Sequence, residues 1–224
     1  MQKTGKIIGR CRDMKTFIFD LDGVLVFTDQ FHYQAWKKMA DRLGVYFDEK
    51  INNRLRGVGR MESLEIILEK STKSYSDAEK EDLAEEKNHY YLELLKTMTP
   101  EDVDPAVRRT LEKLRSQGHK LAIGSSSRNT KFILQQTALT DQFDAISDGT
   151  NIKRAKPDPE VFLKAAEFVG DQPENCIVVE DAVAGIDAAK AGGMLAAGIG
   201  EAQFYEKTDY PLKRFEDILS IKDR

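Results

Sequence analysis

The sequence K-T-F-I-F-D-L-D-G, residues 15–23, places a short apolar run directly before two aspartates and a glycine. The run is rich in aromatic and β-branched side chains, as is typical of a strand buried on both faces of a parallel sheet. Asp20 and Asp22 lie two positions apart, so in an extended backbone both carboxylates leave the chain on the same side. Gly23 then permits a sharp turn. The stretch therefore predicts a strand that delivers two carboxylates to one spot.

Similar apolar runs recur along the chain, with helical patterns between them. Their positions are 120–124, 143–147, 176–180 and 194–199. Helices are expected over 104–118 and 158–170, because each begins with an aspartate followed by a proline and closes with a glycine. This alternation predicts an α/β fold with an open, parallel, Rossmann-like sheet of at least five strands. Such sheets bind ligands beyond the carboxyl ends of their strands, so the residues that follow each run are candidate site residues.

Residues 29–98 interrupt this alternation with helical periodicity. Two apolar stripes mark their helices: Phe31, Ala35, Trp36, Met39, Ala40 and Leu43 in one, and Leu64, Ile67 and Leu68 in the other. Amphipathic helices of this kind pack as a small bundle. We therefore predict an inserted helical cap domain over 29–98 and an α/β core domain over 1–28 and 99–224. Because both crossings lie next to the end of the first strand, the cap can close over the ligand site.

The composition favours a small-molecule substrate. The 34 basic and 38 acidic residues give a formal charge of -4, which excludes the basic footprint of a nucleic-acid binder. Cys11 and Cys176 form no C-x-x-C pattern, so we expect neither a disulfide framework nor a zinc site. No segment is long and apolar enough for a membrane span or an export signal. We expect a cytosolic monomer without nucleic-acid or membrane partners, and we assign no role to residues 1–13.

A serine-rich loop follows the second apolar run. Its members are Ser125, Ser126, Ser127, Arg128 and Asn129. Hydroxyls and free backbone N–H groups at the start of a helix bind anions, although such a loop on its own is more often only a helix cap. Lys156 lies in A-K-P-D-P, where two prolines restrict the backbone and fix the direction of the ammonium group. A lone lysine there is usually solvated.

Glu180 and Asp181 lie at the end of the apolar run 176–180. Adjacent acids at the end of a buried strand repel each other unless a cation offsets their charge, and carboxylate oxygens suit Mg²⁺. Each of the four polar elements is weak evidence alone. Together they fall at the carboxyl ends of predicted parallel strands and supply a nucleophile, a phosphate clamp, a cation and metal ligands.

F-D-L-D-G-V, the serine loop, K-P and E-D resemble the four motifs of the haloacid dehalogenase superfamily, from Met14 onward. The resemblance implies that Asp20 is a covalent nucleophile and Asp22 a general acid and base. It implies that Mg²⁺ is held by Asp20, by the backbone carbonyl of Asp22 and by Asp181, with Glu180 close by. Lys156 and the serine loop, Ser125 included, then neutralise the transferring phosphate.

The inserted bundle is similar to the cap of the β-phosphoglucomutase family. T-D-x-F-H-x-x-A-W (28–36), R-G-V-G-R (56–60) and K-N-H-Y-Y (87–91) carry this resemblance. It implies that His32 and Trp36 lie near the hinge, that Arg60 grips the distal phosphate and that Lys87 lines the inner face of the cap. The predicted substrate-binding residues are His32, Trp36, Gly57, Val58, Arg60, Lys87, Ser125, Ser126, Ser127, Asn129 and Lys156. Taken alone, Trp36 could be only a core residue, and Arg60 or Lys87 could be only a solvated residue on a helix surface.

Three positions depart from the pattern of that family. Phe27 replaces an aspartate at the hinge, Gly59 replaces the serine before the cap arginine, and Arg128 replaces the lysine of the serine loop. These changes affect closure or substrate grip and leave the chemical residues intact. His89 and His119 have no partner pattern, so both are predicted to lie on the surface.

The implied reaction converts β-glucose 1-phosphate to glucose 6-phosphate through an aspartyl-phosphate at Asp20 and a 1,6-bisphosphate. One alternative is a sugar-phosphate phosphatase, in which water discharges the aspartyl-phosphate. A second is a phosphosugar-binding module without catalysis, against which the intact set of acids and Lys156 argues. Arg60 and Lys87 favour the mutase, because a phosphatase needs no grip on a second phosphate.

Overall fold

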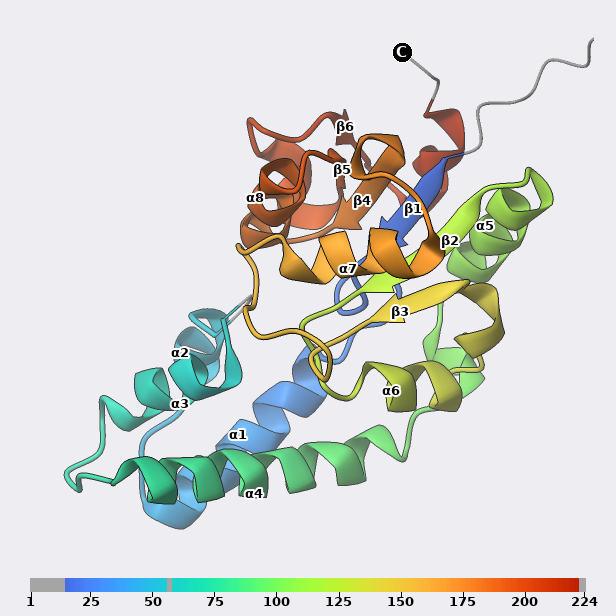
Figure 1. The fold of residues 1–224 in the computed structure, drawn as a ribbon. Coiled ribbons are helices and arrows are strands. Elements are labelled where there is room, and N and C mark those ends of the chain that lie inside the picture. The colour runs from blue at the N-terminus through green and yellow to red at the C-terminus, as the bar shows by residue number, and fades with distance from the viewer. Residues whose placement is uncertain (1–14, 56–57, 222–224) are drawn as a thin grey trace, which may run out of the picture.

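A computed structural model of the protein describes residues 15–55 and 58–221. Figure 1 shows two lobes, one built around a sheet and the other made of helices, which are joined near the carboxyl end of the first strand. Residues 1–13, which were assigned no role, and the predicted binding residue Gly57 lie outside the described residues. The predicted fold class is confirmed.

Within the described residues, six parallel strands form one sheet in the order β3-β2-β1-β4-β5-β6. Their bounds are β1 (Thr16–Phe19), β2 (Lys120–Gly124), β3 (Ala145–Ser147), β4 (Cys176–Glu180), β5 (Leu195–Gly198) and β6 (Tyr210–Pro211). Thr16 aligns with Lys120 of β2 on one side and with Cys176 of β4 on the other. This register brings the residues after β1, β2 and β4 to the same level, so their side chains meet at one edge of the sheet.

Helices cover both faces of the sheet (Figure 1). The bounds are α5 (Pro105–Ser116), α6 (Thr130–Gln136), α7 (Glu160–Val169), α8 (Val183–Ala191) and the 3-10 helix η5 (Phe215–Ser220). Phe17 and Phe19 of β1 pack in one hydrophobic core with α5, α6 and η5. Ile18 points to the opposite core, which it shares with α7 and α8. Since successive residues of β1 face opposite cores, both faces of the strand require apolar side chains, which Phe17, Ile18 and Phe19 provide.

The predicted helix ends are present. The Asp104 carboxylate accepts a hydrogen bond from the backbone N–H of Ala106 at the start of α5. Asp158 accepts from the N–H of Glu160, so α7 begins just after the expected aspartate and proline. Gly170 ends α7 in the left-handed conformation, with φ of 68°. These caps satisfy backbone groups that a helix leaves without partners at its ends.

The helical lobe contains α1 (Asp29–Leu43), α2 (Glu49–Asn53), α3 (Arg60–Leu68) and α4 (Asp77–Leu95). It has a hydrophobic core of its own, to which both predicted apolar stripes contribute; its members include Trp36, Met39, Ala40, Leu64 and Ile67. Ser76 and Glu79 form a reciprocal capping box at the start of α4. Ala35 of α1 and Tyr91 and Leu95 of α4 pack instead in the core that contains Phe17 and Phe19, so these two helices connect the helical lobe to the sheet.

Short elements complete the chain and include the features that the sequence did not predict. The remaining 3-10 helices are η1 (Pro100–Asp102), η2 (Thr140–Gln142), η3 (Pro173–Asn175) and η4 (Gly200–Phe204). The two-residue strand β6 was not predicted, because such a short segment has no periodicity to detect. In the described part of the chain, no helix combines the length and the apolar character that a bilayer crossing requires.

Candidate active site

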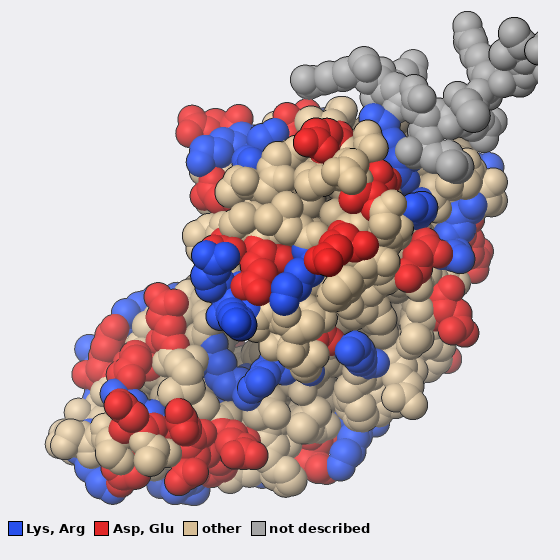
Figure 2. All heavy atoms as spheres, in the orientation of Figure 1, with Lys and Arg blue, Asp and Glu red and all other residues tan. Residues whose placement is uncertain are grey.

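A cavity of about 430 Å³ lies between the carboxyl edge of the sheet and the helical lobe. Figure 2 shows basic side chains gathered around the hollow between the two lobes. Every predicted site residue within the described ranges lines this cavity: Asp20, Asp22, His32, Trp36, Val58, Arg60, Lys87, Ser125, Ser126, Ser127, Asn129, Lys156, Glu180 and Asp181. The structure therefore brings together residues that are up to 161 positions apart, from Asp20 to Asp181.

The core side of the cavity contains a charged cluster. The Lys156 ammonium donates to Oδ1 of Asp20 at 2.5 Å and to Oε1 of Glu180 at 2.6 Å. The Lys156 side chain is only 10% exposed, so its ammonium group is held in the site, as predicted, and is not solvated. Asp20, Glu180 and Asp181 each offer a carboxylate oxygen, and these oxygens lie within 4.8 Å of one another. We call these four residues the core cluster.

Two glycines allow the acids of the core cluster to approach the neighbouring backbone. Gly23 has φ of +82°, and a Cβ there would collide with the carboxylate of Asp181. A Cβ on Gly185, in α8, would collide with the carboxylate of Glu180. A larger residue at either position would push an acid out of the cluster, and at Gly23 it would also strain the backbone.

The core cluster carries more negative than positive charge. Burial raises the pKa of Asp20, the Lys156 ammonium only partly offsets this effect, and Glu180 raises the pKa further. Burial and the charge of Glu180 likewise raise the pKa of Asp181. Burial acts to lower the pKa of Lys156, but Asp20 and Glu180 together hold it above its ordinary value. The three acids and one ammonium therefore leave an excess of negative charge in a buried place.

This excess is what a divalent cation offsets. Three converging carboxylates supply hard oxygen ligands, which are the ligands that Mg²⁺ prefers. Asp20, Glu180 and Asp181 fit such an ion. The carboxylate of Asp22 does not belong to this group among the described residues, which is compatible with the predicted role of its backbone carbonyl.

The Asp22 carboxylate is held at the hinge between the lobes. Its Oδ1 accepts a hydrogen bond from the Thr28 hydroxyl, and Thr28 Oγ1 accepts at 2.9 Å from the hydroxyl of Tyr91 in α4. Thr28 and Tyr91 are buried, with exposed fractions of 1% and 0%. Burial raises the pKa of Asp22 to about 6, against the effect of the Thr28 hydrogen bond. A carboxyl with this pKa can both release and accept a proton near neutral pH.

Lys87 lies on the cap side and is almost fully buried, at 4% exposed. Its Nζ lies 2.9 Å from Nδ1 of His32 and 4.7 Å from the ring centroids of Trp36 and Tyr91. Burial, followed by the charge of Arg60, lowers the pKa of Lys87 to about 7. Burial also lowers the pKa of His32, so its ring stays neutral and Nδ1 can accept from the ammonium. This burial excludes the alternative that Lys87 is a solvated residue on a helix surface.

The serine loop folds on itself at the edge of the sheet. The N–H of Ser127 donates to Ser125 Oγ, and the N–H of Asn129 donates to Ser127 Oγ, both at 3.2 Å. Ser125 is buried beside the core cluster, whereas Arg128 is exposed at the mouth of the cavity. The polar character of this loop comes mainly from its serine hydroxyl groups, because the helix α6 that follows it is short.

Asn88 and Tyr91 are among the cavity residues that were not predicted from the sequence, and the prediction for His119, outside the cavity, was wrong. Asn88 and Tyr91 line the cavity, and both lie in the K-N-H-Y-Y stretch that carried the resemblance. Helical spacing was an available signal, because Lys87 and Tyr91 are four residues apart and share a face. His89 is exposed as predicted. His119 is not a free surface residue: its Nδ1 accepts from the N–H of Lys15, and its ring contacts Phe17 edge to face.

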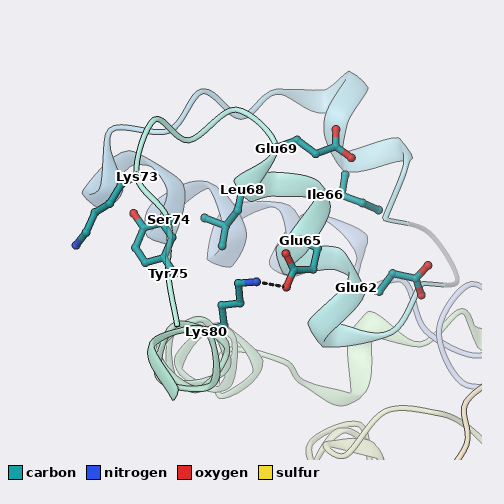
Figure 3. A pocket seen from close by; sticks show the side chains of 9 residues that line it. All are labelled: Glu62, Glu65, Ile66, Leu68, Glu69, Lys73, Ser74, Tyr75 and Lys80. Atoms are coloured by element: carbon teal, nitrogen blue, oxygen red, sulfur yellow. Dashed lines mark ion pairs between the residues drawn. The ribbon is translucent and has the colours of Figure 1, made fainter. Parts of the chain in front are cut away.

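A second hollow of about 420 Å³ lies on α3, the loop to α4 and the first turn of α4 (Figure 3). Lys80 points across it and pairs with Glu65 at 2.7 Å. Its other charged members are Glu62, Glu69 and Lys73. The residues that line it come from the helical lobe alone, and none of them belongs to the core cluster. It has the character of a solvated helix surface.

Comparison with known proteins agrees with this geometry. Residues 14–193 match the family model described as haloacid dehalogenase-like hydrolase. The chain is 42% identical to the β-phosphoglucomutase of Bacillus subtilis over 92% of both chains. It is 34% identical to a phosphorylated carbohydrates phosphatase of Thermotoga maritima, over 81% of this chain and 82% of that one. The crystal structure of β-phosphoglucomutase from Clostridium difficile superimposes with a TM-score of 0.84 and 39% identity, covering 92% of this chain and 93% of that chain.

Proposed function

Since the chain belongs to the haloacid dehalogenase-like hydrolase family and, within it, to the β-phosphoglucomutase family, we propose that it interconverts β-D-glucose 1-phosphate and D-glucose 6-phosphate. The observation that carries the proposal is a cavity with cations at two places. Lys156 lies in the core cluster, and Arg60 and Arg128 line the cavity away from it. Such a cavity suits a sugar that carries a phosphate at each end.

The proposed reaction begins from the form phosphorylated on Asp20. The 6-hydroxyl of β-glucose 1-phosphate attacks phosphorus, the bond from phosphorus to the Asp20 oxygen breaks, and β-glucose 1,6-bisphosphate forms. After the bisphosphate reorients, Asp20 attacks the 1-phosphate and the bond from phosphorus to the sugar oxygen breaks. Glucose 6-phosphate leaves, and the phosphoenzyme is restored. Asp20 suits the nucleophile because it lies directly after the central strand β1, in contact with Lys156.

Asp22 is the proposed acid and base. It accepts the proton of the attacking 6-hydroxyl and returns a proton to the leaving 1-oxygen in the second half of the cycle. Its pKa of about 6 suits both tasks. The hydrogen bond from Thr28 keeps the carboxylate at the junction of the two lobes, so closure of the cap is coupled to the position of the proton carrier.

Mg²⁺ is the proposed cofactor, bound by Asp20, Asp181 and the backbone carbonyl of Asp22, with Glu180 close by. When bound, it supplies positive charge at the transferring phosphate and lowers the pKa values of the crowded acids. Lys156 and the serine loop hold the remaining phosphate oxygens. Positioning and charge stabilisation then account for most of the rate.

The helical lobe is proposed to act as the cap domain, with residues 29–98 inserted into a core of 1–28 and 99–224. The burial of Lys87 and the half-buried position of His32 at its inner face support this division, because both polar groups line the cavity. Closure excludes water from the aspartyl-phosphate, so the sugar hydroxyl is favoured as acceptor. We further propose a monomer in the cytosol that binds neither nucleic acid nor membrane.

A sugar-phosphate phosphatase is the second candidate, because the phosphatase from Thermotoga maritima is also related over most of its length. The two activities differ in their products. A coupled assay for glucose 6-phosphate, run beside an assay for free phosphate on the same β-glucose 1-phosphate, separates them. Phosphate release that equals substrate loss would establish the hydrolase and overturn the mutase. Repeating the assay with the α anomer and other hexose phosphates defines the sugar.

Asp20→Asn tests the nucleophile. The amide cannot form the aspartyl-phosphate, so turnover is expected to fall by at least about 10⁴-fold, as when other covalent nucleophiles are removed. The circular dichroism spectrum should match that of the wild-type protein, because the amide is isosteric with the carboxylate. Full turnover in this variant would refute the assignment.

A further inference from the structure

Asn88 joins the two lobes through a single side-chain atom. Its Oδ1 accepts a hydrogen bond from Nη2 of Arg60 and another from Nδ2 of Asn129, both at 3.0 Å. Arg60 is the first residue of α3, Asn88 belongs to α4, and Asn129 is the last residue of the serine loop of the core. A carboxamide oxygen has two lone pairs, and here both are used.

Each donor keeps hydrogen-bonding capacity after this contact. A guanidinium has five N–H groups, and Asn88 engages one nitrogen of Arg60. The Asn129 amide has two N–H groups and gives one of them to Asn88. Asn88 therefore does not compete with a ligand for these side chains. It holds each side chain through one hydrogen bond and leaves the remaining N–H groups able to bind a ligand.

The charge of Arg60 is only weakly compensated by acids. Within residues 15–55 and 58–221, Arg60 makes no ion pair at 4.0 Å or less. Burial and the neighbouring Arg128 lower the pKa of Arg60, and the charge of Glu85 offsets only part of this effect. A half-buried guanidinium beside a second guanidinium, with a neutral amide as its acceptor, is poorly compensated. An anion between Arg60, Arg128 and Asn129 would supply the missing charge.

We propose that Asn88 is a positioning residue for the second phosphate of the sugar bisphosphate, which holds Arg60 of the cap and Asn129 of the core aimed at one anion. The proposal rests on the mutase function and names how its second phosphate is recognised. A free arginine side chain loses rotamer freedom on binding, and the contact with Asn88 removes part of that loss beforehand. The same contact ties cap to core at the point where the phosphate binds.

The test compares a ligand that has two phosphates with one that has a single phosphate. In the Asp20→Asn background, which does not turn over, calorimetry with Mg²⁺ gives the affinities for β-glucose 1,6-bisphosphate and β-glucose 1-phosphate. We expect Asn88→Ala to lower the preference for the bisphosphate about tenfold, the factor for one hydrogen bond to a charged group. Asn88→Asp keeps the acceptor oxygen and adds a charge that repels phosphate, so its preference should fall further than that of Asn88→Ala.

Asn53→Ala is the matched control, because Asn53 is an exposed asparagine of α2 outside the cavity. It should leave both affinities unchanged. In the otherwise wild-type enzyme, Asn88→Ala should raise KM for the bisphosphate about tenfold while kcat stays within about twofold. Phosphorylation of Asp20 by acetyl phosphate, a donor with one phosphate, should also stay within about twofold, because it does not use the second subsite.

The failures can be told apart. Suppose that the wild-type chain forms glucose 6-phosphate and that Asn88→Ala prefers the bisphosphate over the monophosphate as strongly as the unsubstituted protein does. The proposed role of Asn88 is then overturned, and the mutase function stands. Equal loss of affinity for both ligands, or equal loss with acetyl phosphate, would show a merely structural role and overturn the inference. A wild-type chain that makes no glucose 6-phosphate and does not prefer the bisphosphate would overturn the mutase and this inference together.

Discussion

Two buried lysines face the same cavity, and their surroundings shift their pKa values in opposite directions. Lys156 belongs to the core cluster, where Asp20 and Glu180 raise its pKa. Lys87 lies among His32 and aromatic rings in the cap, where burial and Arg60 lower its pKa to about 7. Among the described residues, Lys87 makes no ion pair with a carboxylate. Burial alone therefore does not decide the charge of a lysine; the acids around it do.

The difference suggests different functions for the two side chains. Lys156 is permanently charged and holds two carboxylates in place, so its removal should damage both the fold and the chemistry. Lys87 carries a charge that is costly in the absence of substrate. Anionic substrate in the cavity would favour its protonated form, so the cap stores unfavourable free energy that substrate binding relieves. Three experiments test this contrast, from the largest expected effect to the smallest.

Lys156→Met should have the largest effect on stability. It leaves Asp20 and Glu180 buried without their cation, and removal of one partner of a buried ion pair costs about 3–5 kcal/mol. Urea unfolding at pH 7.5 in EDTA measures the change. The added substitution Glu180→Gln removes one of the orphaned charges and should restore part of the loss. Lys156→Met with wild-type stability would show that the ion pairs do not hold the core cluster together.

Magnesium should have the next largest effect. An ion that binds the folded state at 100 times its Kd stabilises it by about 2.7 kcal/mol. Unfolding in MgCl₂ and in EDTA should therefore differ for the wild-type protein. In Asp181→Asn, which removes one carboxylate of the core cluster, the difference should shrink. The Lys87 region contributes no ligand, so Lys87→Met should keep the full magnesium effect. A wild-type protein that gains nothing from MgCl₂ would contradict the metal assignment.

The core side of the site could be predicted from the sequence for a physical reason. In a parallel sheet, residues that follow neighbouring strands must meet, and the register of β1 with β2 and β4 makes them meet at one level. Asp20 and the serine loop directly follow such strands, and Glu180 is the last residue of β4. Lys156 was predicted less directly, since it depends on the path of a loop between β3 and α7.

The cap side could be predicted only by resemblance. The contacts of Lys87 with His32, and of Tyr91 with Thr28, depend on how α1 and α4 cross, and no local pattern specifies that crossing. The K-N-H-Y-Y stretch placed Lys87 on a helix but did not reveal that its ammonium is buried without an acid. The bridge of Asn88 between Arg60 and Asn129 joins three segments and was missed for the same reason.

Lys87→Met should have the smallest effect, and its sign is opposite to that of Lys156→Met. The folded pKa of about 7 lies below the ordinary value of 10.5, so the unfolded chain binds more protons between these values. The wild-type protein therefore loses stability as pH falls from about 10.5 to about 7, and below that range the loss is complete. Met fills similar space without the charge. After allowance for the lost contacts with His32 and the rings, Lys87→Met should gain about 2 kcal/mol at pH 7.

The pH dependence separates this explanation from a general packing effect. The gain of Lys87→Met should fade as the pH rises toward 10, because the wild-type lysine is then neutral in the folded protein and the unfolded chain, with its ordinary pKa of 10.5, begins to lose its proton as well. Urea unfolding of both proteins at pH 7, 8.5 and 10 measures it. Lys113→Met is the control, because Lys113 lies exposed on α5, and it should change little at any pH. A gain that is constant with pH would mean that Lys87 is not desolvated in the folded protein, and the contrast between the two lysines would fail.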